Sequence, residues 1–230
     1  MQYGPSSYDR RHVINAYYQY DLPAGKGYRF HGGPAVDWFL GGWYTSGVFS
    51  KWTGVPVKVT ESSQVWGGGT ATIGATDYMV PTAPLPSTGL SRNVANNTTC
   101  SNSIFNGTVG GNVGGASGSN MDLFSNPGAA LCGFNYIQLS SRGRTGSANP
   151  MYGLPFWNFD MRLGKTTAIK ERFKLEFSAD FFNIFNHENF NNPSLSIGSP
   201  ASFGVITGTY TPPNRTNSAR WIQMGLRLNF

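Results

Sequence analysis

The last ten residues of the chain, 221–230, alternate strictly between two chemical characters. Successive side chains of an extended strand point to opposite faces, so residues two apart share a face. One face carries Ile222, Met224, Leu226, Leu228 and Phe230, and the other carries Trp221, Gln223, Gly225, Arg227 and Asn229. The pattern predicts a strand with one face suited to hydrocarbon and one suited to water.

Two earlier segments show the same alternation. In residues 173–181, Phe173, Leu175, Phe177, Ala179 and Phe181 oppose Lys174, Glu176, Ser178 and Asp180. In residues 154–164, Trp157, Phe159, Met161 and Leu163 oppose Asn158, Asp160, Arg162 and Gly164, and a turn over residues 165–172 is expected to follow. Burying such ionic faces in a dry core costs several kcal/mol per unpaired group, so these faces are expected to meet water.

The first part of the chain contains two further predicted strands. In residues 11–22, His12, Ile14, Ala16, Tyr18, Tyr20 and Leu22 share one face, and the more polar Arg11, Val13, Asn15, Tyr17, Gln19 and Asp21 share the inward one. This strand ends at Pro23 to Gly27, and an irregular link through residues 32–42 leads to a strand over residues 43–60. Thr, Ser and Gly occur on both sides of that strand, so its two faces cannot be assigned from sequence.

Residues 61–150 lose all periodicity and consist largely of Gly, Asn, Ser, Thr and Pro. So long a loop argues against a compact soluble domain, but long outward loops are normal in outer-membrane barrels. Cys100 and Cys132 both lie in this stretch, and in an oxidising compartment we expect them to form a disulfide. Two unpaired thiols in the loop are the alternative.

The predicted fold is all-β, an antiparallel transmembrane β-barrel portion of about five strands. If Phe230 ends at the periplasm, antiparallel pairing puts the connections around residues 23–42 and 165–172 on the periplasmic side. Residues 61–150 and 186–218 then form outer loops, so short turns lie inside and long loops outside. Phe173 and Phe230 would lie near the periplasmic interface of the membrane. Phe181, Phe185 and Trp157 would lie near its outer interface.

Composition excludes several classes of protein. Charged residues make up only 12% of the 230 residues and aromatic residues 14%, with 30 glycines, which is unlike a helical or disordered chain. No apolar run reaches the roughly 20 residues that a spanning helix requires. The net charge of +6 is scattered, without a basic stripe, so nucleic acid is not an expected partner. The N-terminus lacks a signal-peptide pattern, so either the chain begins within a longer protein or the membrane interpretation is wrong.

No catalytic constellation emerges, and we expect neither an enzyme nor a cofactor or metal site. His12, His31 and His187 lack metal-ligand spacing, and the common nucleophile, phosphate-binding and Cys-x-x-Cys motifs are missing. The carboxylates Asp160, Glu176 and Asp180 are expected to pair with Arg162, Lys174 and Arg227 across adjacent strands. Phe182 is predicted to point inward, and with Phe185 and Phe190 near the outer mouth it is a candidate for ligand contact.

Several stretches resemble one family, the C-terminal barrel region of TonB-dependent receptors, especially the type with a carboxypeptidase-regulatory-like N-terminal domain that is common in acidobacteria. The matching stretches are Tyr3-Gly4-Pro5-Ser6 with Asp9-Arg10-Arg11-His12, Leu22-Pro23-Ala24-Gly25-Lys26-Gly27, Gly41-Gly42-Trp43 through Ser46-Gly47, Gly54-Val55-Pro56, Phe173 to Phe177, Phe181 to His187 and Gly225 to Phe230. Each is short, but their order and spacing along residues 1–230 make the combination specific.

The resemblance implies that residues 1–230 supply about the last five strands of a 22-stranded barrel in the bacterial outer membrane. The family imports a bulky, scarce nutrient, such as an oligosaccharide or a siderophore. Implied partners are outer-membrane lipid and lipopolysaccharide, the barrel assembly machinery, which reads the strand Ile222 to Phe230, and the TonB energy transducer through an N-terminal part not present here.

Two other hypotheses remain open from the residues alone. The same alternation, with a loop rich in Asn, Thr and Gly, is compatible with a soluble secreted β-sandwich that binds glycans or acts as an adhesin. The other hypothesis is a small pore in which several copies of the chain together close one barrel. The hypotheses differ in what covers the apolar face of the strands.

Overall fold

The computed structural model describes residues 4–61, 77–92, 94, 113–114, 121–135, 150–170, 173–212 and 217–230. The chain divides into two compact units. The sheet unit comprises residues 13–52, 156–189 and 210–230, and the loop unit comprises residues 1–12, 53–155 and 190–209.

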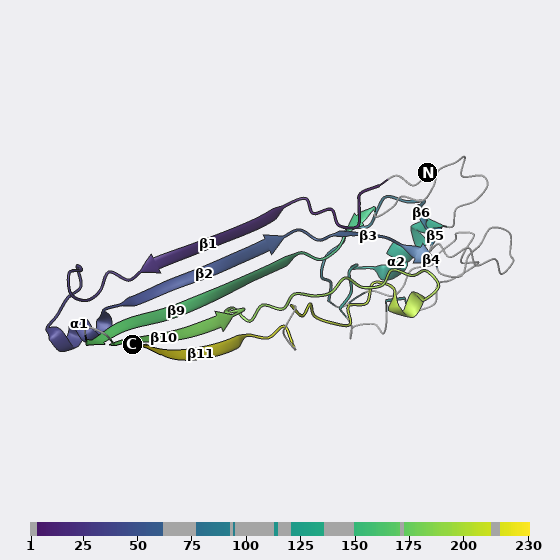
Figure 1. Cartoon of the computed structure of the whole chain (residues 1–230). Coiled ribbons are helices and arrows are strands. Elements are labelled where there is room, and N and C mark those ends of the chain that lie inside the picture. The colour runs from purple at the N-terminus through teal and green to yellow at the C-terminus, as the bar shows by residue number, and fades with distance from the viewer. Residues whose placement is uncertain are drawn as a thin grey trace. The chain divides into compact units, whose positions relative to one another are not determined.

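The sheet unit is built on five antiparallel strands, which lie side by side in Figure 1. They are β1 (Val13–Asp21), β2 (Trp43–Trp52), β9 (Phe156–Lys170), β10 (Phe173–Phe182) and β11 (Trp221–Asn229). Their order across the sheet equals their order along the chain, as in an up-and-down barrel. Four of them have 9 or 10 residues, which is the length that a tilted strand needs to cross a bilayer. Within the described residues, the sheet stays open, with β1 and β11 at its edges.

The strand register assigns the faces of β2, which the sequence left undecided. Thr45, Gly47 and Phe49 are paired with Leu163, Met161 and Phe159 of β9, so they belong to the face that carries the apolar residues. Tyr44, Ser46, Val48 and Ser50 belong to the opposite face, opposite Gly164, Arg162, Asp160 and Asn158. The predicted faces of residues 161–164, 174–181 and 221–229 agree with the register on both sides of β10, and the register of β9 and β10 shifts between Phe173 and Lys174.

The structure corrects the predicted turn over residues 165–172. Strand β9 continues to Lys170, so only residues 171–172 separate it from β10. The residues that follow Gly164 are Lys165, Thr166, Thr167, Ala168 and Ile169. Thr and Ile favour extended backbone, and none of the five breaks a ladder.

Two other boundaries differ from the prediction. The link through residues 32–42 contains a helix, α1 (Pro34–Leu40), with Pro34 at its first turn, where a missing N–H costs nothing. The strand predicted over residues 43–60 ends at Trp52 and is followed by the short strands β3 (Pro56–Val57) and β4 (Thr60–Glu61). Pro56 opens β3, a position at which a strand tolerates proline.

The loop unit has its own hydrophobic core. Its remaining elements are β5 (Asp77–Tyr78), β6 (Val80–Pro81), α2 (Pro127–Cys132), β7 (Phe134–Asn135), β8 (Met151–Tyr152) and the short 3-10 helix η2 (Pro200–Ser202). Fully buried Leu123, Phe124, Leu131, Phe134 and Phe203 form the centre, where the rings of Phe124 and Phe203 stack at 5.6 Å. The glycine-rich composition of residues 61–150 gave no sign of this core, because its members are scattered without a period.

Within the described residues of the sheet unit, no second layer covers the apolar face of strand β11. Met224, Leu226 and Phe230 are exposed at 71%, 70% and 94%, and Ile222 and Leu228 are exposed as well. A soluble sandwich would bury these side chains, which gains about 25 cal/mol for each Å² of apolar surface. Among the described residues, no helix is long and apolar enough to cross a membrane.

Candidate functional site

The polar face of the sheet carries one continuous row of side chains across all five strands. The register aligns Gln19 of β1, Ser46 of β2, Arg162 of β9, Asp180 of β10 and Gln223 of β11. We call these five residues the polar row. Each occupies the polar phase of its strand, so the alternation of the sequence places them on one face, and the register brings them to one level.

An ion pair occupies the centre of the polar row. Arg162 donates from Nε to Asp180 Oδ1 at 2.5 Å and from Nη2 to Asp180 Oδ2 at 2.9 Å. This two-pronged geometry matches the planar guanidinium to the carboxylate. The predicted pairing of Asp180 with a cation on an adjacent strand is therefore present.

The other two predicted carboxylates make different contacts. Asp160 Oδ1 accepts hydrogen bonds from Asn158 Nδ2 at 2.9 Å and from the backbone N–H of Asn183 at 2.7 Å. Glu176 lies opposite Arg227 in the register and accepts a hydrogen bond from the Tyr44 hydroxyl at 3.4 Å. Asp160 thus fixes the end of β10, a role that strand alternation alone did not indicate.

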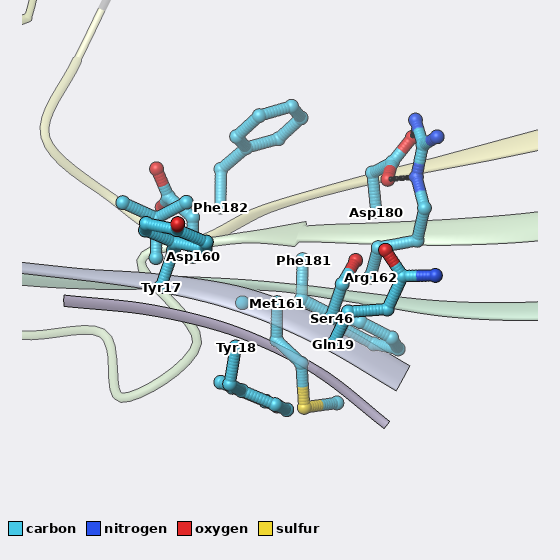
Figure 2. A pocket seen from close by; sticks show the side chains of 12 residues that line it. Tyr17, Tyr18, Gln19, Ser46, Asp160, Met161, Arg162, Asp180, Phe181 and Phe182 are labelled. Atoms are coloured by element: carbon cyan, nitrogen blue, oxygen red, sulfur yellow. Dashed lines mark hydrogen bonds and ion pairs between the residues drawn. The ribbon is translucent and has the colours of Figure 1, made fainter. Parts of the chain in front are cut away.

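A hollow of about 350 Å³ lies at the polar row. Besides Gln19, Ser46, Arg162 and Asp180, its lining includes Tyr17, Asp160 and Phe182. Figure 2 shows the Phe182 ring and the Arg162–Asp180 pair on one side of the sheet, whereas Tyr18 and Met161 point to the other side. The polar side therefore offers amide, hydroxyl, ionic and aromatic groups within one concave region.

The three phenylalanines predicted to contact ligand have different surroundings. Phe182 borders the hollow, and its ring lies 6.1 Å from that of Trp221. Phe185 packs at 6.1 Å from Trp157 and 5.7 Å from Phe159, which belong to the apolar face. Phe190 falls in the loop unit, where it forms a bridge with Thr209. Ligand contact by these residues stays a prediction, and only Phe182 has a setting that supports it.

The segment Phe181 to His187 has a structural role at the end of β10. Asn183 and Asn186 adopt left-handed backbone conformations with φ of 52° and 51°, which asparagine tolerates better than most residues. The buried Asn183 side chain donates to the carbonyls of His187 and Ser218 and accepts from the His187 N–H. The segment therefore ties β10 to the start of β11.

His187, one of the three histidines that lack metal-ligand spacing, is half-buried and packs on strand β9. Its ring lies 4.1 Å from the ring of Trp157. Burial lowers the pKa of His187 below its ordinary value, although the Asn189 side chain, Glu188 and the Trp157 backbone act in the opposite direction. The described ranges contain no group of three or more His, Cys, Asp or Glu residues that could hold a metal ion.

The remaining predicted site residues are the cysteines and the C-terminal strand. Cys132 ends helix α2 and is disulfide-bonded. Cys100, its predicted partner, lies outside the described residues, so the pairing stays a prediction. Ile222, Met224, Leu226 and Leu228 lie on the edge strand β11, and Phe230 directly follows it. All five side chains are exposed, and their role as an assembly signal stays a prediction.

Gln19, Ser46 and Gln223 were not singled out from the sequence. For Gln19 and Gln223 the only signal in the sequence is their place on the polar side of an alternating strand. Ser46 has no such signal, because β2 does not alternate clearly. Aligning them requires the register, which depends on the connections between strands.

Comparison with known proteins identifies the family. A family model described as an outer membrane beta barrel domain matches residues 1–223. No curated protein and no solved structure matches the chain. The matched range includes β1, β2, β9 and β10, whose polar face carries four of the five residues of the polar row. The chain therefore belongs to the outer membrane beta barrel domain family.

Proposed function

We propose that this chain forms the C-terminal part of the barrel wall of a TonB-dependent receptor, which imports a bulky, scarce nutrient across the bacterial outer membrane. The family membership supports an outer-membrane barrel. The motif resemblance, from Tyr3-Gly4-Pro5-Ser6 to the closing Gly225 to Phe230, supports the receptor type.

The observation that carries the proposal is the opposition between the two faces of one open sheet. The polar row and its Arg162–Asp180 pair face one side, and exposed Met224 and Leu226 face the other. The smallest outer-membrane barrels use about eight strands, so a five-stranded sheet needs further strands to close. A large barrel whose other strands come from the same polypeptide meets this need.

Among nutrients, an oligosaccharide suits the polar row best. Gln19, Ser46 and Gln223 supply neutral hydrogen-bonding groups, and Tyr17, Phe182 and Trp221 lie on the same face of their strands. Sugar rings present hydroxyl groups at their rim and C–H groups on their faces, which amides and aromatic rings match. In a receptor of this type, the plug domain also meets this wall from inside.

Transport is tested with cells that produce the complete gene product containing residues 1–230. We expect uptake of radiolabelled maltodextrins that stops when a protonophore dissipates the inner-membrane proton gradient. Ferric siderophores are the second probe. Uptake of neither class, or uptake that the protonophore leaves unchanged, contradicts the importer proposal. An upstream reading frame without a plug domain contradicts it independently.

The barrel wall itself is tested by cysteine labelling of neighbouring positions on β2. Ser46→Cys, on the polar face, should react with a membrane-impermeant maleimide, whereas Thr45→Cys, on the apolar face, should not. Both are made in a Cys100→Ser/Cys132→Ser background. Equal labelling, with a protein that stays monodisperse without detergent, favours the soluble sandwich instead. A discrete oligomer with ion conductance favours a pore made of several copies.

A further inference from the structure

The connection between β1 and β2 contains an element that packing in water does not explain. Helix α1 has seven residues, none of them buried, and Trp38, Phe39 and Leu40 are exposed at 52%, 68% and 50%. An isolated helix this short is not stable in water, and exposed apolar side chains contribute nothing to its formation. The helix therefore requires support from the sheet and from whatever covers its aromatic residues.

The support from the sheet is Lys165 of β9. Its ammonium group donates to the carbonyls of Trp38 at 3.0 Å, Phe39 at 2.7 Å and Gly41 at 2.8 Å. The end of a helix leaves such carbonyls without partners and carries a partial negative charge. The last turn of α1 has no basic residue of its own, so a lysine 124 to 127 positions away in the sequence supplies the charge.

Trp43 completes this clamp. Its indole N–H donates to the Phe39 carbonyl at 3.0 Å, and its ring lies 5.1 Å from the Lys165 ammonium. Gly42 makes the approach possible: its φ is +75°, and a Cβ there would collide with the Thr166 carbonyl oxygen. The Gly41-Gly42-Trp43 sequence thus brings the helix end against β9.

The clamp holds α1 on the apolar side of the sheet. Lys165 is paired with Trp43 and Phe177 and shares its face with Leu163, so it extends from the face that carries the apolar residues. Figure 1 shows α1 at the end of the sheet where the C-terminus also lies. Exposed Trp38, Phe39 and Leu40 therefore continue the apolar face of the strands at its margin.

We propose that α1 is an interfacial anchor whose Trp38, Phe39 and Leu40 insert into the boundary between headgroups and acyl chains of the adjacent phospholipid leaflet. Aromatic residues concentrate at this depth, and short amphipathic helices lie in it with their apolar face toward the acyl chains. Lys165, on a face exposed to lipid, keeps its charge at the boundary by bonding the helix end. The inference rests on the proposed membrane location of the sheet.

The test uses the complete gene product, reconstituted in phosphatidylethanolamine and phosphatidylglycerol vesicles. Phe39→Cys is labelled with an environment-sensitive fluorophore, and the vesicles contain phosphatidylcholine with a nitroxide near the headgroup end of the acyl chain. We expect roughly twofold quenching, as for a side chain at the acyl boundary. Lys26→Cys, an exposed position in the same connection, is the control and should not be quenched.

The role of the clamp is tested with Lys165→Met in the Phe39→Cys protein. Losing the ammonium should lower lipid quenching of the label and raise its quenching by aqueous iodide. Lys165→Arg retains donors for the carbonyls and should restore much of the lipid quenching. An anchor that forms without the clamp would leave both readouts unchanged, which contradicts this part of the inference.

A label at Met224→Cys separates failure of the anchor from failure of the proposed function, because Met224 lies on the apolar face of β11. Lipid quenching at residue 224 without quenching at residue 39 overturns the anchor alone. The anchor is also overturned if the label at residue 39 is quenched neither by lipid nor by aqueous iodide, because protein would then cover the helix. Absence of lipid quenching at both positions overturns the membrane location on which the anchor depends.

Discussion

At the scale of single residues, Asp122 of the loop unit is an ionisable side chain that lies in the hydrophobic core. It is fully buried, its backbone pairs with Ser91, and its Oδ1 accepts from the Phe124 N–H at 2.8 Å. No donor among the described residues reaches Oδ2. Burial raises the pKa of Asp122 from 3.8 to about 6, against the opposing effect of the Phe124 and Leu123 N–H groups.

The raised pKa predicts that the loop unit loses stability as pH rises. The folded state keeps the Asp122 proton up to about pH 6, whereas the unfolded state releases it near 3.8. Protonated Asp122 therefore makes its full favourable contribution to the free energy of unfolding below about pH 4. This contribution declines between about pH 4 and 6 and is lost above pH 6. The shift corresponds to about 3 kcal/mol at most. Asp122→Asn should make the stability of the loop unit less dependent on pH. Hydrogen exchange of the Leu123 and Phe124 amides between pH 4 and 7 measures this stability.

Asp9→Asn is the control for this prediction, because Asp9 lies in the same unit but is exposed. It should leave the decline unchanged. If Asp122→Asn keeps the full pH dependence, burial of Asp122 is not its cause.

The Arg162–Asp180 pair is predicted to contribute little to stability despite its geometry. The Arg162 side chain is 47% exposed and that of Asp180 18% exposed, so water screens the pair. A double-mutant cycle with Arg162→Met and Asp180→Asn should give a coupling of about 1 kcal/mol or less, reduced further at high salt. Denaturation in detergent at low and high salt measures it. A coupling several times larger that salt does not reduce would mean that the pair is desolvated in the complete barrel.

At the scale of elements, glycines permit tyrosine rings to lie flat across neighbouring strands. A Cβ on Gly164 would collide with the ring of Tyr44, and one on Gly47 would collide with the ring of Tyr18. The first contact lies on the polar face and the second on the apolar face. On the polar face, the tyrosine hydroxyl reaches Glu176 on β10, so the Gly164–Tyr44 contact links three strands.

Replacing Gly164 should therefore weaken the sheet. Gly164→Val displaces the Tyr44 ring and its bond to Glu176, at an expected cost of about 1–3 kcal/mol. Gly225→Ala is the matched control in the same cross-strand row, because its Cβ meets only the flexible Ser178 hydroxyl. The midpoint of thermal unfolding in detergent compares the two. Equal midpoints would mean that Tyr44 moves aside without cost.

At the scale of the whole molecule, the exposed apolar face decides where the sheet can reside. Its side chains on β11 are exposed within the described part of the sheet unit, and β1 and β11 have the length of membrane-crossing strands. Exposure of such a face to water is unfavourable, whereas contact with apolar lipid tails carries no hydrophobic penalty. The polar face then has to enclose water or other protein.

This arrangement predicts different tolerance for charge at neighbouring positions of β11. Leu226→Arg, on the apolar face, should destabilise the folded protein by about 2–4 kcal/mol if it lies near the bilayer midplane. Gln223→Arg, on the polar face beside Asp180, should have little effect. The heat-modifiable folded fraction in outer membranes measures both. Equal loss for the two variants would show that the two faces do not differ in environment.

The sequence by itself determined the long strands and, for four of them, which side chains share a face. Alternation is a local property of the strand, so the faces of residues 11–22, 154–164, 173–181 and 221–230 could be assigned without any neighbour. It also indicated that ionic and apolar faces meet different environments. Asp180 was correctly expected to pair with a cation on an adjacent strand.

Only the tertiary structure decided what depends on register and on long-range packing. The polar row required alignment of five strands, and β2 could be oriented only through its partners. The continuation of β9 to Lys170, the helix α1 and the loop-unit core arise from contacts between distant residues. The clearest case is the contact between Lys165 and the carbonyls of α1. Both segments are needed for this contact, so neither segment of the sequence predicts it alone.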